Sequence, residues 1–91
     1  MTFEDLEFKP LHDGVGAKAF FENGYGASVI RHKNSYGSSR GLYELAVTKG
    51  DADSWELCYT TPITDDVIGF LTTDDVTTLL NQIEALPCPA N

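Results

Sequence analysis

Apolar and polar residues alternate along two neighbouring stretches in the middle of the chain, residues 42–49 and 55–61. A period of two is typical of a strand with one buried face, and the polar run between them, residues 50–54, suits a hairpin connection. The side chains that this pattern places on the buried face are Tyr43, Leu45, Val47, Trp55, Leu57 and Tyr59. We therefore predict a central β-hairpin whose apolar face needs a cover.

The cover is predicted from the C-terminal part of the chain, residues 72–86. Thr72 is the expected N-cap, and Asp75 follows three residues later in a capping-box arrangement. Apolar residues then recur at helical spacing and form one stripe: Val76, Leu79, Leu80, Ile83 and Leu86. Because Pro87 ends the pattern, the sequence predicts one amphipathic helix that packs on the hairpin.

A second hairpin is predicted over residues 17–31, where Asn23-Gly24 separates two β-prone runs and favours a type I′ turn. Residues 3–9 suggest a short strand or an irregular arm, and Pro10 prevents this segment from continuing as a central strand. The apolar run at residues 67–71 is expected to be buried.

Together these elements predict a single α+β domain over residues 1–91: a small antiparallel sheet of about four strands, in two hairpins, packed against one C-terminal helix. Its parts are an N-terminal arm (1–16), the sheet (17–71), the helix (72–86) and a tail (87–91).

Charge is distributed unevenly along the chain. Residues 1–49 contain all six basic residues and an equal number of acids, so the whole net charge of −8 falls in residues 50–91. A surface of this sign repels phosphate backbones and attracts basic partners, which argues against direct nucleic-acid binding. A solubilising surface is the simpler interpretation of the same charge.

Two features point to a cytoplasmic protein. No apolar run approaches the roughly 20 residues of a membrane span, and the first residues lack the basic and apolar regions of an export signal. Cys58 and Cys88 are too few for a disulfide framework, and Cys58 is expected to be a small buried apolar residue.

Candidate partner-binding residues fall in two groups. The acidic group comprises Asp51, Asp53, Asp65, Asp66, Asp74 and Asp75. The second group surrounds the polar loop at residues 32–41 and comprises Arg31, Lys33, Tyr36 and Arg40, a basic cluster with one aromatic residue. Simpler interpretations are a solvated connector for the loop and a helix-dipole role for Asp74 and Asp75.

No catalytic, cofactor or metal motif is recognisable. The run from Asp51 to Glu56 has an acidic, calcium-like composition but lacks the turn glycine and the distant glutamate of an EF-hand loop. Adjacent aspartates in a loop or a first helical turn point apart, so the aspartate pairs are poor candidates for acid and base chemistry. The sequence therefore indicates a non-enzymatic protein without a cofactor.

The segments at residues 21–29, 41–47 and 57–71 resemble a set of small uncharacterised proteins encoded by tailed bacteriophages. The resemblance covers residues 17–86. It implies expression in an infected bacterial cytoplasm, but it implies no activity and no functional residues.

Three functions follow as hypotheses. The first is a phage accessory protein that binds a basic surface of a host protein through its acidic half. The second is a DNA mimic that inhibits a nucleic-acid-binding enzyme. The third is a homo-oligomer in which the basic loop, residues 31–40, docks on the acidic half of a neighbouring copy.

Overall fold

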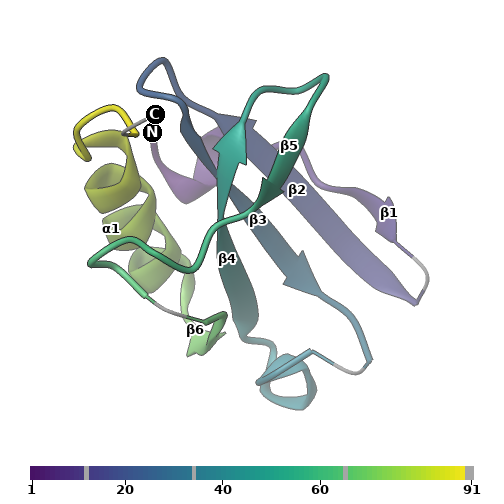
Figure 1. The fold of residues 1–91 in the computed structure, drawn as a ribbon. Helices are drawn as coiled ribbons and strands as arrows, with labels where there is room; N and C mark the ends of the chain where they lie inside the picture. Colours follow the sequence, from purple (N-terminus) through teal and green to yellow (C-terminus); the bar gives the residue numbers. More distant parts are fainter. Residues whose placement is uncertain (12, 34, 65, 90–91) are drawn as a thin grey trace.

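The computed structural model describes residues 1–11, 13–33, 35–64 and 66–89, which form an antiparallel six-stranded sheet with one α-helix (Figure 1). The strand order is β1-β2-β3-β4-β5, and β6 also pairs with β4. The predicted α+β class is confirmed, with more strands than the four expected. The elements are η1 (Phe3–Asp5), β1 (Lys9–Leu11), β2 (Gly14–Phe20), β3 (Tyr25–Arg31), η2 (Ser38–Arg40), β4 (Tyr43–Gly50), β5 (Trp55–Leu57), β6 (Ile68–Leu71) and α1 (Thr73–Glu84).

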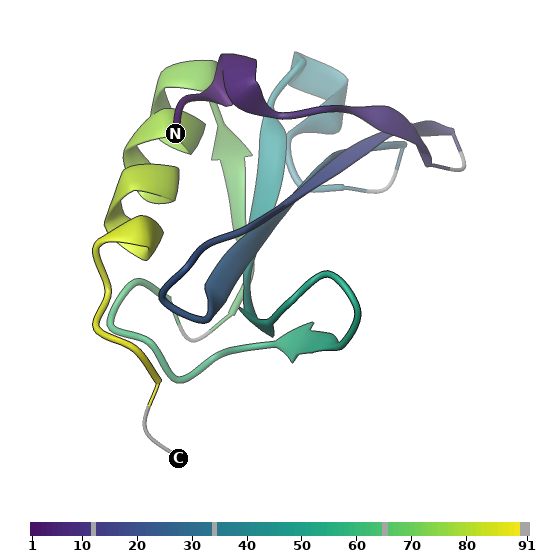
Figure 2. The same ribbon diagram turned by 90° about the horizontal axis from the view of Figure 1, so that it is seen from above.

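The predicted helix and its stripe are confirmed. Val76, Leu80 and Ile83 are completely buried, and Leu79 and Leu86 are partly buried against the same core. The side chains that they meet on the sheet include Ala27, Val29, Leu45 and Val47 of β3 and β4. Figure 2 shows α1 on one side of the sheet, with η1 beside it.

The helix begins at the predicted capping box. Thr72 Oγ1 accepts a hydrogen bond from the Asp75 amide at 3.1 Å, and the Asp75 carboxylate accepts one from the Thr72 amide at 3.0 Å. Both bonds satisfy amides that have no partner within the helix.

The β2–β3 hairpin is confirmed, but its turn is not type I′. The Gly24 amide donates to the Phe21 carbonyl at 3.1 Å, and the Phe21 amide donates to the Tyr25 carbonyl at 2.8 Å. Gly24 has a φ of 89°, and the turn has no other residue with a positive φ. The connection is therefore a three-residue turn that ends in a left-handed glycine, and the side chain of Asn23 is available for another role.

The predicted face of the β4–β5 hairpin is confirmed for β4, where Leu45 and Val47 are completely buried in the core, but it is wrong for β5. Thr48 pairs with Leu57 and Gly50 with Trp55, so the odd-numbered residues of β5 share a face with the even-numbered residues of β4. A one-residue change of register moves every side chain to the other face. Trp55, Leu57 and Tyr59 are accordingly 39%, 46% and 41% exposed and do not pack under α1.

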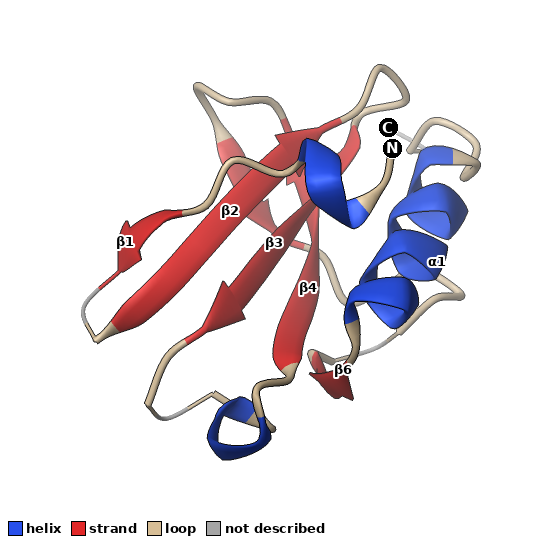
Figure 3. Cartoon of the chain, turned by 180° about the vertical axis from the view of Figure 1, so that it is seen from behind, coloured by secondary structure: helices blue, strands red, loops and turns tan. Residues whose placement is uncertain are grey.

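For residues 3–9 the strand alternative is wrong and the irregular arm describes the chain, because η1 occupies Phe3–Asp5 and β1 begins at Lys9. The chain crosses β2 on the helix side of the sheet before it reaches β1 (Figure 3). Phe3 and Phe8 lie there against Tyr43, with ring centroids 5.0 and 5.6 Å away. This aromatic cluster anchors the N-terminal arm.

Candidate functional site

The hairpin loop after β4 holds the first pair of candidate aspartates. Asp51 Oδ1 accepts hydrogen bonds from the amides of Asp53 and Ser54, both at 3.0 Å, so this carboxylate stabilises the loop itself. Asp53 is exposed. Of this pair, Asp53 is the better candidate for a contact with a partner.

Two other acidic candidates, Asp74 and Asp75, lie near the opposite end of β4. Asp74 and Asp75 are exposed in the first turn of α1, which directly follows β6, and β6 pairs with Tyr43 at the start of β4. Asp66 accepts a hydrogen bond from the Val67 amide at 2.8 Å. Asp65 lies outside the described residues. The structure therefore does not gather the predicted aspartates into one patch, because the hairpin loop is at the far end of an eight-residue strand.

The structure brings only some of the candidate side chains of the basic loop, residues 31–40, close to one another. Arg31 and Lys33 line one shallow depression together with Asp13. The Arg31 guanidinium lies over the Tyr43 ring, 5.0 Å from its centroid. Lys33 and Arg40 are exposed and form no ion pair within the described parts of the chain.

Tyr36, the aromatic residue of the basic cluster, is 61% exposed and has an aromatic neighbour. Its ring stacks on Phe70 at a centroid distance of 6.5 Å, and Phe70 is 56% exposed. The expectation that the run at residues 67–71 is buried is therefore wrong for Phe70. A β-bulge interrupts the pairing of β6 with β4, and Phe70 has a φ of 58°, so its side chain turns outward.

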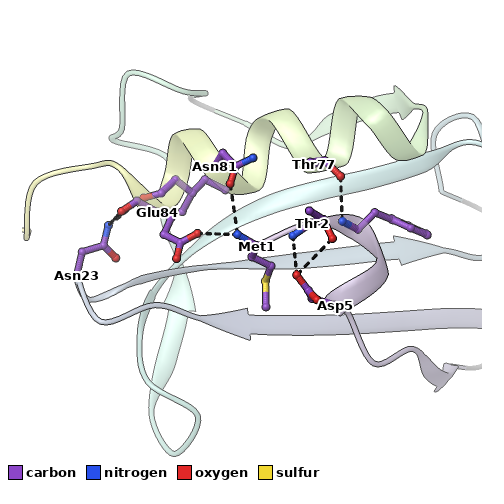
Figure 4. A network of polar contacts seen from close by, with 9 residues as sticks. Met1, Thr2, Asp5, Asn23, Thr77, Asn81 and Glu84 are labelled. Carbon is purple, nitrogen blue, oxygen red and sulfur yellow. Dashed lines mark hydrogen bonds and ion pairs between the residues drawn. The ribbon is translucent and has the colours of Figure 1, made fainter.

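The first residues of the chain lie along α1 (Figure 4). The N-terminal ammonium group bonds to Glu84 Oε1 at 3.1 Å and to Asn81 Oδ1 at 3.3 Å. The Phe3 amide donates to Thr77 Oγ1 at 2.9 Å. These contacts join η1 and α1 into one layer, which could not be predicted from the sequence because the partners are more than 70 residues apart.

The ionisable side chains of this layer are all carboxylates: Glu4, Asp5, Asp74, Asp75 and Glu84. We call this group the acidic layer. All of its members are exposed. The N-terminal ammonium is the one cationic group that contacts it within the described residues.

Two carboxylates of the acidic layer have altered acidity. The Thr72 amide holds the pKa of Asp75 below its ordinary value, with a further contribution from the Thr72 hydroxyl. The Thr2 amide likewise lowers the pKa of Asp5. Both shifts come from hydrogen bonds to the charged form, so these carboxylates carry capping roles as well as charge.

A surface that the sequence interpretation missed is the sheet face opposite α1. A trough of about 450 Å³ crosses it, lined by Leu11, Gly16, Lys18, Phe20, Ile30 and Trp55 among others. Lys18 lies over the Trp55 ring at 5.2 Å, and Phe20 is 6.5 Å from the same ring. The alternation of residues 55–57 is compatible with either register, and the observed one places Trp55 and Leu57 on this face.

Within the described ranges no group of three or more His, Cys, Asp or Glu side chains is arranged to hold a metal ion. Cys58 is buried and free, and Cys88 is exposed and free. No helix in the described part of the chain has the length and apolar character needed to cross a membrane. Comparisons with family models, curated proteins and solved structures gave no match to this chain.

Proposed function

We propose that this chain is a non-enzymatic accessory protein, of bacteriophage origin, that binds a basic surface of a host protein. The observation that carries the proposal is the acidic layer, in which every ionisable side chain of η1 and α1 is an exposed carboxylate. Such a surface attracts a basic partner over distances comparable with the Debye length, about 8 to 10 Å at physiological salt.

The layer also has the rigidity that a binding surface needs. Its helix packs on the core through the buried residues Val76, Leu80 and Ile83. Its N-terminal segment is held by a hydrogen bond to Thr77 and an ion pair with Glu84. A backbone that is already ordered loses little conformational freedom when a partner binds.

The test is capture of partners from a bacterial lysate at low and high salt with charge-reversed variants. Glu4→Lys with Asp74→Lys removes charge from the acidic layer and leaves the capping carboxylates Asp5 and Asp75 in place. The matched control is Asp53→Lys with Glu56→Lys, which makes the same change of charge at the β4–β5 hairpin.

We expect salt-sensitive capture of a basic protein that the layer variant loses and the control retains. Equal loss of capture in both variants would show that total charge, and not the acidic layer, attracts the partner, and undiminished capture by the layer variant would overturn the proposal. Loss of capture in the control alone would move the site to the hairpin and overturn the proposal.

Two other proposals use the same charges. A DNA mimic needs carboxylates spaced along one extended surface, and it is less well supported because the hairpin aspartates lie at the far end of β4 from Asp74 and Asp75. A homo-oligomer is favoured by Lys33 and Arg40, because their side chains are exposed and form no ion pair within the described residues. Light scattering separates it from the first proposal, because a monomeric mass at both low and high salt excludes self-association.

A further inference from the structure

The outer edge of β2 has backbone groups that no neighbouring strand uses. The bond from the Phe21 amide to the Tyr25 carbonyl keeps the register of the β2–β3 pairs, so the odd-numbered residues of β2 bond to β3. In an antiparallel pair, hydrogen-bonded and non-hydrogen-bonded positions alternate. The amides and carbonyls of the even-numbered residues, including Lys18 and Phe20, therefore point away from β3.

Strand β1 covers only the first part of this edge. It pairs with β2 from Gly14 to Gly16 and goes no further. Within residues 1–11, 13–33, 35–64 and 66–89, no backbone hydrogen bond reaches the outward groups of Lys18 or Phe20. The reason is the path of the N-terminal arm, since Phe8 packs against Phe3 and Tyr43 on the helix side instead of continuing along β2.

The side chains beside this open edge define what can bind there. Lys9 and Lys18 are both exposed, lie on the trough face, and are diagonal neighbours, because Lys9 pairs with Gly16. Glu7 lines the same trough but forms no ion pair with either lysine in the described chain. In a protein with a net charge of −8, this edge is locally basic.

We propose that an extended acidic segment of a partner protein adds to the sheet at this edge, alongside residues 17–20. Its backbone bonds to the outward amides and carbonyls of Lys18 and Phe20, and its carboxylates on the trough face meet Lys9 and Lys18. Side chains alternate between the two faces of a strand, so every second side chain of the partner lies on the trough face with Lys9 and Lys18.

A second copy of this chain is a poorer occupant of the edge. Antiparallel pairing of β2 with β2 of another copy brings two Lys18 side chains to one face, and each copy adds a net charge of −8. The open edge of β2 is also distinct from the acidic layer, which lies on the helix side. Either proposal can therefore be refuted without affecting the other.

The experiment uses the fluorescence of Trp55, the single tryptophan of the chain, which lies under Lys18. The probe is a capped hexapeptide that alternates glutamate with valine. We expect saturable binding that Lys18→Glu weakens at least tenfold. The matched control Lys49→Glu, on the opposite face where Lys49 pairs with Tyr25, is expected to change the Kd less than twofold.

Two further arms separate strand addition from simple charge attraction. A version of the peptide N-methylated at alternate amides keeps its charge but loses its donors, and we expect it to bind at least tenfold more weakly. In the free protein, the amides of Lys18 and Phe20 should exchange with deuterium much faster than those of Ala17 and Ala19, and the peptide should slow them at least tenfold.

Equal binding of the N-methylated peptide would overturn the proposal, as would slow exchange at Lys18 and Phe20 in the free protein. If that slow exchange depends on protein concentration, a second copy occupies the edge. If the slow exchange does not depend on protein concentration, the chain's own N-terminal arm occupies the edge.

Discussion

The side-chain amide of Asn23 donates to the Ile83 carbonyl at 2.9 Å and so joins the β2–β3 turn to the last turn of α1. The same nitrogen is 3.2 Å from the Glu84 carbonyl and 2.9 Å from the Leu86 carbonyl. Ile83 and Glu84 are the last residues of α1, where carbonyls lack partners within the helix, and the Ile83 carbonyl also accepts a bond from the Leu86 amide at 3.1 Å. A turn residue thus caps a helix 60 residues away in sequence.

Asn23→Asp is expected to destabilise the protein by about 1–3 kcal/mol, because a carboxylate cannot donate to these carbonyls and places negative charge at the negative end of the helix dipole. The substitution keeps the oxygen that accepts from the Tyr25 amide at 3.0 Å, so the turn itself is preserved. The measurement is urea unfolding. Glu22→Gln, at the exposed neighbouring position, serves as the control and should change stability by less than about 0.5 kcal/mol.

Two buried threonines should respond to valine with opposite signs. Thr48 Oγ1 is buried and has no hydrogen-bond partner in the described residues, whereas Thr61 Oγ1 accepts from the Ile63 amide at 3.3 Å. Thr48→Val removes an unsatisfied polar group and should stabilise the protein by about 1 kcal/mol, whereas Thr61→Val removes a bond and should destabilise it by a similar amount. Thermal and urea unfolding of both variants check this. A loss of stability in Thr48→Val would mean that the hydroxyl has a partner, such as a bound water.

Local signals in the sequence identified α1 and the β2–β3 hairpin, and the pairing of the strands decided what these signals missed. Thr72, Asp75 and the leucine stripe specify α1 within a single segment. The face of Leu57 could not be predicted, because alternation is the same in either register and the loop that Asp51 closes selects between them. The acidic candidates are divided between two ends of the sheet because of the strand topology, which their positions in the sequence do not reveal.

Close packing at Gly26 leaves no room for a larger side chain. A Cβ there would lie 2.3 Å from the Ala19 carbonyl oxygen and 2.6 Å from Thr48 Oγ1, so backbone must move. Gly26→Ala should destabilise the protein by about 2 kcal/mol or more. At Gly16, by comparison, the closest atom to a Cβ would be Leu11 Cδ2 at 3.1 Å, a side-chain atom that can shift. Gly16→Ala should therefore cost clearly less in the same unfolding experiment, and equal losses would contradict the packing argument.

The hydrogen bonds at the start of α1 make stability depend on pH in a defined direction. Donation from Thr72 lowers the pKa of Asp75 below its ordinary value of 3.8, so the folded state binds this proton less readily than the unfolded state does. The resulting stabilisation is fully present above pH 3.8 and is lost as the pH falls through the folded-state pKa. Asp75→Asn keeps an oxygen acceptor without the charge, so the stability advantage of the native protein over this variant should shrink below pH 3.8. Carboxyl NMR titration supplies the direct measurement, and a midpoint for Asp75 at or above 3.8 would show that the capping box does not favour the charged carboxylate.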